Sequence, residues 1–177
     1  MERTLAIIPI GAMPKNLCRE VGTHLQETLG VPFELLISLG EPKYAFNAGN
    51  DQFHATAIVR RVGQAISPRK HLMGVGLCEV DLFMPDVNFV FGDSDREGKA
   101  AVVSLARLRP SWYGRPPDHS LLMRRLASEV LHEVGHVLGL PGCNHESCAM
   151  FISNTLSDTD RKEARLCDSC RSRAVVS

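Results

Sequence analysis

The stretch HEVGHVLGLPGC, residues 132–143, decides how the rest of this sequence is interpreted. His132 and His136 are four residues apart, so on a helix their imidazoles lie on one face, one turn apart, where both reach a single zinc ion. Glu133 follows His132 directly and can take the proton of a water molecule whose pKa zinc lowers towards neutrality. The pattern therefore predicts two zinc ligands and a general base for attack on a peptide carbonyl.

The helix that carries this pattern is expected to begin after Ser120, as its N-cap, and to end just before Gly139. The alternative to a metal site is a solvated helix face with two surface histidines. The other residues near the motif are apolar, and they favour a partly buried site: Leu126, Val130, Leu131, Val134, Val137 and Leu138.

Cysteines form the second feature. Four residues separate Cys143 from Cys148, and two separate Cys167 from Cys170. Both spacings suit thiolates that converge on one tetrahedral zinc, which would tie down a tail with little apolar surface. Four unrelated thiols are the plain alternative. A redox role for the last pair would need a strand-to-helix setting that the sequence does not predict there.

Composition places the chain among ordinary globular proteins. Its 177 residues suit a single domain, with 44% hydrophobic and 23% charged residues. Lysine plus arginine equals aspartate plus glutamate, at 20 each, so neither a nucleic acid nor a membrane is an expected partner. The N-terminus lacks a convincing signal peptide and no long apolar run follows, so a cytoplasmic location is expected.

A basic tail prompts one weaker alternative, a zinc ribbon that binds nucleic acid. The tail contains Arg161, Lys162, Arg165, Arg171 and Arg173. Neutral overall charge favours a solvated tail over that alternative.

Apolar periodicity predicts an alternation of strands and helices, and therefore an α/β layered domain. Strands are expected at 4–10, 31–40, 72–78, 87–92 and 100–108, and amphipathic helices at 16–30 and 53–66, before the motif helix. Loops or turns are expected at 41–52, 93–99 and 109–120, and a loop-like segment after Gly139.

Together these residues resemble the archaemetzincin family, within the metzincin clan of zinc peptidases. The family signature is HExxHxxGxxHC, four residues, CxM, a spacer and CxxC. Segments 82–95, 100–114 and 126–140 are also similar to the family, so the resemblance covers most of the chain. The signature positions matched here are His132, Glu133, His136, Gly139, Cys143, Cys148, Met150, Cys167 and Cys170.

The resemblance implies a zinc-dependent peptidase that acts on peptides or proteins. The implied fold is a twisted mixed sheet packed on helices, in one domain over 1–177. Residues 1–139 end in the active-site helix, and residues 140–177 form a segment stapled by zinc. The resemblance also implies that a strand near 100–108 forms the sheet edge that pairs with an extended peptide substrate. An ordinary sheet strand without that role is an equally supported alternative. The implied roles are catalytic zinc ligands (His132, His136), general base (Glu133), Met-turn residue (Met150) and structural zinc ligands (Cys143, Cys148, Cys167, Cys170).

One position departs from the family signature, because its third histidine falls at Gly142. A catalytic zinc needs three protein ligands and an open position. Losing one ligand should cost several kcal/mol, judged from roughly 10–16 kcal/mol for a four-ligand structural zinc. Either His145 replaces it, or zinc binds weakly, or the site is empty and the chain is a peptide-binding pseudo-peptidase. Weak or absent zinc is favoured, because the structural zinc would pin the loop that holds His145.

Overall fold

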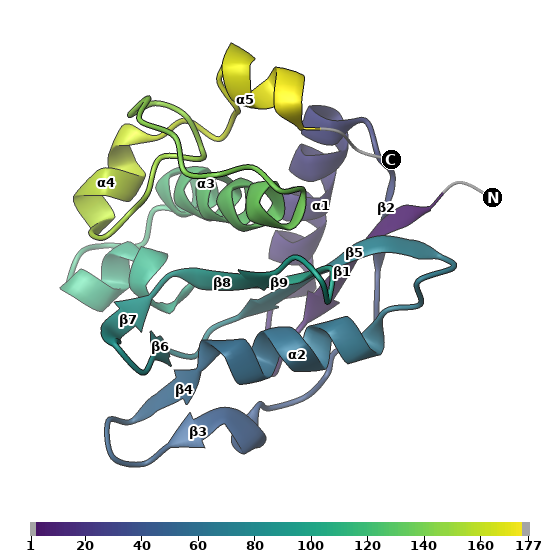
Figure 1. Cartoon of the computed structure of the whole chain (residues 1–177). Helices are drawn as coiled ribbons and strands as arrows, with labels where there is room; N and C mark the ends of the chain where they lie inside the picture. The colour runs from purple at the N-terminus through teal and green to yellow at the C-terminus, as the bar shows by residue number, and fades with distance from the viewer. Residues whose placement is uncertain (1–2, 175–177) are drawn as a thin grey trace.

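The computed structural model describes residues 3–174 and contains a main sheet of five strands in the order β2-β1-β5-β9-β8 (Figure 1). Four of the strands are parallel, and β8 joins the edge antiparallel to β9. The bounds are β1 (Thr4–Pro9), β2 (Phe33–Leu35), β5 (His71–Cys78), β8 (Gly92–Asp95) and β9 (Ala100–Ser104).

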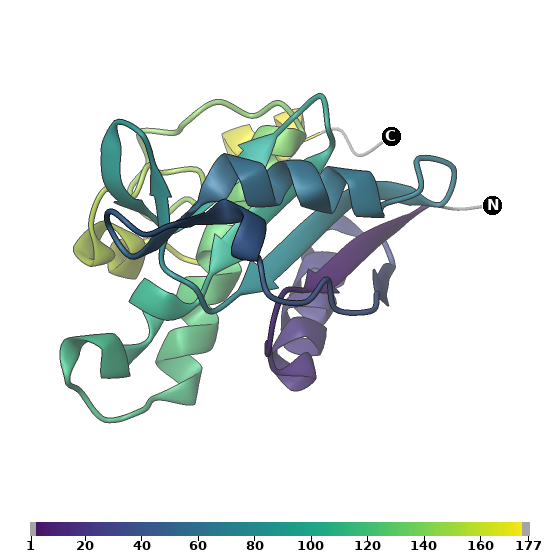
Figure 2. The same ribbon diagram turned by 90° about the horizontal axis from the view of Figure 1, so that it is seen from below.

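Helices cover both faces of this sheet. Alternate residues of a strand point to opposite faces, and β1 follows that rule. Leu5 and Ile7 join the apolar core beneath α1 (Lys15–Leu29) and α3 (His119–Val137), whereas Ala6 and Ile8 join the core beneath α2 (Ala55–Ala65). Figure 2 shows α2 lying across the face of the sheet opposite α3. β5 is buried along its whole length, as a central parallel strand should be.

A smaller sheet lies beside β8 and leads into it. Its order is β3-β4-β6-β7, and β7 precedes β8 directly in the chain. Its strands are short: β3 (Phe46–Asn47), β4 (Gln52–His54), β6 (Leu82–Met84) and β7 (Val87–Val90). Short 3-10 helices occupy Lys43–Ala45, Ala106–Leu108 and Pro110–Tyr113.

After α3 the chain returns over that helix. Figure 1 shows the C-terminal segment, with α4 (Leu156–Arg161) and α5 (Asp168–Arg173), on the side of α3 away from the sheet. A capping box starts α4, in which Thr155 accepts the backbone N–H of Asp158 and the Asp158 carboxylate accepts the backbone N–H of Thr155. The fold is therefore the mixed α/β architecture that the sequence predicts.

Several local predictions were wrong. Asp118, not Ser120, caps α3, because its side chain accepts the backbone N–H of Leu121 at 3.0 Å. The polar segment 93–99 begins in strand β8, so β8 is the sheet edge and β9 is internal. The segment after Gly139 contains two helices, the predicted loop 41–52 contains β3 and the start of β4, and only three residues of 31–40 form a strand.

Lys162 contradicts the prediction of a solvated basic tail. Its side chain is fully buried, and its Nζ lies 2.8 Å from Oε1 of Glu129 on α3. The N-terminal predictions agree better, since β1 and α1 fall within a residue of their expected bounds. In the described part of the chain, no helix combines the length and the apolar character that a bilayer crossing requires.

Candidate metal centres and catalytic cavity

The two motif histidines face each other on the last turns of α3. Their Nε2 atoms are 3.0 Å apart. The Nδ1 of His132 lies 2.9 Å from the carbonyl oxygen of Ala149, and the Nδ1 of His136 lies 2.9 Å from that of Leu140. A carbonyl oxygen only accepts, so each Nδ1 carries the hydrogen and donates it. In the neutral rings both Nε2 lone pairs then converge on one point.

Two converging lone pairs repel each other unless a cation lies between them. A tetrahedral zinc with Zn–N distances of about 2.0–2.1 Å would hold two ligand nitrogens roughly 3.3 Å apart. Burial lowers the pKa of His132 to about 4, with a further contribution from the charge of Lys162. The ring therefore stays neutral at physiological pH, which is the form that binds a metal. The histidine pair fits a zinc ion.

Glu133 lies beside the pair, buried beneath the edge strand. Its Oε2 accepts a hydrogen bond of 2.8 Å from the Oγ of Ser94 on β8. Burial raises the pKa of Glu133 to about 8, and the hydrogen bond from Ser94 opposes that shift. A neighbouring divalent cation would favour the ionised carboxylate, which is the form that can take a proton.

Gly92 lets β8 approach this carboxylate closely. A Cβ at this position would lie 2.6 Å from the carbonyl oxygen of Val102 and 2.9 Å from Cγ of Glu133. Sequence reasoning gave no role to Gly92 or Ser94, because Gly92 was expected at the end of a strand over 87–92 and Ser94 in a polar turn over 93–99. The available signal was the match of segment 82–95 to the family.

A cavity of about 190 Å³ opens beside His132 and Glu133. One wall comes from β7 and the start of β8, and the other from residues 152–154, which follow Met150. Val87 and Ile152 are half exposed at its rim, at 50% and 56%. Its remaining lining residues are Phe89, Val90, Phe91, Gly92, Glu129, Ser153 and Asn154.

Glu129 ties the C-terminal segment to the helix at this cavity. Its Oε1 accepts hydrogen bonds from Ser153 Oγ at 2.9 Å and Thr159 Oγ1 at 2.8 Å, and it faces Lys162 Nζ at 2.8 Å. Three groups from the C-terminal segment thus meet one oxygen of α3, one turn before His132. The spacing of these residues along the chain gave no sign of this cluster.

Met150 is fully buried against α3. A Cβ on Gly135 would clash with its sulfur, so the thioether packs against the helix at Gly135. Gly135 lies between His132 and His136 in the sequence. The Met-turn role that the family resemblance implies for Met150 stays a prediction.

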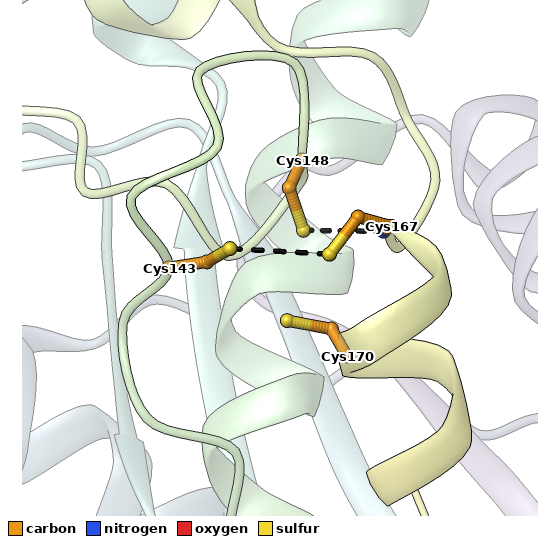
Figure 3. Close-up of side chains that lie close together, drawn as sticks. All are labelled: Cys143, Cys148, Cys167 and Cys170. Atoms are coloured by element: carbon orange, nitrogen blue, oxygen red, sulfur yellow. Dashed lines mark hydrogen bonds between the residues drawn. The ribbon is translucent and has the colours of Figure 1, made fainter.

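The four C-terminal cysteines converge (Figure 3), and their sulfurs all lie within 4.8 Å of one another. The sulfurs of Cys143 and Cys167 are 3.9 Å apart, close to the roughly 3.8 Å that tetrahedral zinc with Zn–S of about 2.3 Å requires. The backbone N–H of Cys170 lowers the pKa of Cys167 to about 7, which favours the thiolate. The cluster is therefore consistent with a structural zinc.

The structure does not bring His145 to the histidine pair. Among the described residues, only the four cysteines form a group of three or more metal-ligating side chains that converge. His145 is exposed, its Nδ1 lies 3.1 Å from Ser147 Oγ, and it borders a groove beside the cysteines. A Cβ on Gly142 would lie 3.0 Å from Cδ1 of Ile152, so Ile152 occupies the space next to the missing side chain.

Comparison with known proteins agrees with this geometry. A family model described as Peptidase family M54 matches residues 42–174. Archaemetzincin from Methanocaldococcus jannaschii is 37% identical over 166 residues, which cover 94% of this chain and 89% of that protein. Archaemetzincin from Pyrococcus horikoshii is 42% identical over 164 residues, 86% of each chain.

A crystal structure of a zinc-dependent peptidase from Methanocorpusculum labreanum superposes with a TM-score of 0.86 at 27% identity. The match covers 97% of this chain and all of that one, at 100%. Fold and relatives together define a zinc metallopeptidase. The chain belongs to the archaemetzincin family, peptidase family M54, which confirms the resemblance drawn from the sequence.

Proposed function

We propose that the chain hydrolyses peptide bonds with a zinc ion held by His132 and His136. The observation that carries this proposal is the 3.0 Å approach of two Nε2 atoms whose rings are both oriented by carbonyl acceptors, next to a buried glutamate. When bound, zinc supplies a Lewis acid that lowers the pKa of water and polarises the peptide carbonyl. Zinc ligation by the four cysteines belongs to the same proposal.

Glu133 is the proposed proton carrier. It takes one proton from the attacking water as the oxygen bonds to the carbonyl carbon. It then passes that proton to the amine nitrogen as the C–N bond breaks. Ser94 holds one oxygen of the carboxylate at 2.8 Å, which leaves the other free to face the water.

The substrate is proposed to bind along β8 as an additional strand. β8 is the last strand of the main sheet, and Ser94 on it contacts the general base. A peptide that pairs with this edge gains main-chain hydrogen bonds and passes the catalytic cavity in an extended form. The cavity of about 190 Å³ would then take one side chain.

Gly142 supports a second candidate, a pseudo-peptidase that binds peptides and holds only the structural zinc. No third histidine, cysteine or carboxylate joins the pair among the residues that the structure describes. With two protein ligands, zinc at the histidine pair would be held several kcal/mol less tightly than with three, on the roughly 10–16 kcal/mol scale of a four-ligand site. The two candidates differ in the number of zinc ions that the protein retains.

Metal content and hydrolysis of a peptide library test the choice. We expect one zinc ion per chain after dialysis and a second in excess zinc, which His132→Ala removes. Glu133→Gln should lower kcat at least 100-fold, because removal of a general base costs about 10²–10⁴ in rate, and should leave zinc content unchanged. Glu163→Gln is the control, because this exposed glutamate lies 30 residues after Glu133 in the sequence. Hydrolysis that survives Glu133→Gln contradicts the peptidase mechanism, and absence of the second zinc favours the pseudo-peptidase.

A further inference from the structure

Both metal-binding histidines take their orientation from the same short stretch of chain. His132 donates to the carbonyl of Ala149 and His136 to that of Leu140, each at 2.9 Å. Such acceptors fix which ring nitrogen carries the hydrogen and therefore which one is free for a metal. The geometry of the histidine pair thus depends on what holds residues 140–149 in place.

This stretch has little secondary structure of its own. An isolated bridge between Cys143 and Phe151 is its one strand-like feature, with the N–H of Cys143 donating to Met150 O at 2.9 Å. Two cysteines of the four-cysteine site lie within it. Cys148 precedes Ala149 directly, and Cys143 follows Leu140 by three residues.

The other two cysteines approach the same stretch from the opposite side. The N–H of Ala149 donates to the carbonyl of Arg165 at 2.9 Å, two residues before Cys167. The N–H of Cys167 donates to the sulfur of Cys148 at 3.3 Å. The peptide of Ala149 therefore lies between the segment that leads to Cys167 and the imidazole of His132.

We propose that the four-cysteine site is a positioning element of the histidine site. A metal ion on the four thiolates fixes the carbonyls of Ala149 and Leu140, and these carbonyls fix the tautomer and the direction of both imidazoles. When the thiolate site is empty, the rings lose their acceptors and Nε2 no longer points consistently at the metal position. The orientation step stands by itself, and its effect on catalysis rests on the proposed function.

The test compares the full-length native chain with Cys167→Ala, which removes the ligand on the far side of the Ala149 peptide from His132. Cys167→His replaces the thiolate with an imidazole nitrogen, which zinc also accepts as a ligand, and serves as the rescue. Cys18→Ala, at a buried thiol outside the cluster, is the matched control. The readouts are the imidazole ¹H–¹⁵N signals of His132 and His136 and the zinc affinity of the pair.

We expect native protein, Cys167→His and Cys18→Ala to show two slowly exchanging Nδ1–H signals. Cys167→Ala should lose both signals, and its histidine pair should bind zinc about 10–100-fold more weakly, as when outer partners of a metal site are removed. Two preserved Nδ1–H signals in Cys167→Ala with an empty thiolate site would overturn the proposal.

A second measurement guards against a variant that does not fold. A thiophilic chelator empties the thiolate site of the native chain in steps, while the amide signals of β5 report the fold. The Nδ1–H signals should disappear in parallel with the thiolate zinc while β5 stays intact, and their persistence overturns the proposal. If the native histidine pair shows both Nδ1–H signals but binds no zinc, the proposed peptidase function fails. The response of these signals to emptying the thiolate site still tests the positioning role.

Discussion

At the scale of single residues, the zinc affinity proposed for the histidine pair depends on Gly142. Glycine offers no ligand, and the space beside it is taken by the half-exposed side chain of Ile152. A histidine introduced at 142 would therefore meet Ile152 before it reaches the metal position. A larger side chain at position 142 therefore requires a smaller one at position 152.

Gly142→His together with Ile152→Ala should tighten zinc binding at the pair by about 100-fold, since a ligand contributes roughly 3 kcal/mol on the scale of structural zinc sites. Gly142→His alone should gain less, because the new Cβ would lie 3.0 Å from Ile152 Cδ1. Competition with a chromophoric chelator, with the cysteine site kept loaded, measures the affinity. Ile152→Ala alone is the control and should change nothing. A double variant that binds zinc no more tightly than the native chain would show that Gly142 does not limit the zinc affinity.

At the scale of elements, strand β8 brings together the proposed substrate edge and Glu133, the proposed general base. Its four residues are Gly, Asp, Ser and Asp, a composition that does not favour a strand by itself. Pairing with β9 supplies the strand conformation, and Gly92 supplies the clearance over Glu133. A short polar edge strand also resists unwanted pairing with other chains.

Gly92→Ala should lower kcat/KM about 100-fold while the fold persists. The added Cβ would lie 2.6 Å from a backbone oxygen of β9, so β8 must shift and take Ser94 away from Glu133. Steady-state kinetics on a peptide substrate, with thermal unfolding in parallel, measures this effect. Gly49→Ala, in an exposed turn, is the matched glycine control. Unchanged kinetics in Gly92→Ala would show that the close approach of β8 is not needed.

The same element shows how far sequence reasoning reaches. The histidine pair and the cysteine cluster were predicted because metal chemistry fixes the spacing of such residues along the chain, and the structure brings each group together. β8 was missed because neighbouring strands, not its own residues, decide its conformation. Lys162 was missed because a buried lysine depends on a partner that lies 33 residues away in sequence, Glu129, and no local pattern encodes such a pair.

At the scale of the whole molecule, the proposed catalytic cavity lies where three parts of the chain meet. The edge of the main sheet, helix α3 and the C-terminal segment each contribute lining residues. Contacts of Glu129 on α3 with Ser153, Thr159 and Lys162 hold the C-terminal segment on that helix, and the cysteine cluster joins two parts of the segment to each other. The position of the C-terminal segment therefore sets the cavity wall that Ser153 and Asn154 form.

The buried pair should behave as a unit in unfolding. Lys162→Met alone leaves Glu129 buried without its cation and should destabilise the protein by about 3–5 kcal/mol. Lys162→Met with Glu129→Gln keeps the volume and removes both charges, and it should recover most of that loss, because the amide oxygen introduced at position 129 can still accept from Ser153 and Thr159. Urea unfolding measures both variants, and Lys70→Met, whose ion pair with Glu34 is exposed, should unfold like the native protein. Equal destabilisation of the single and double variants would mean that the charges do not act as a pair, and that packing of the lysine stem holds the C-terminal segment on α3.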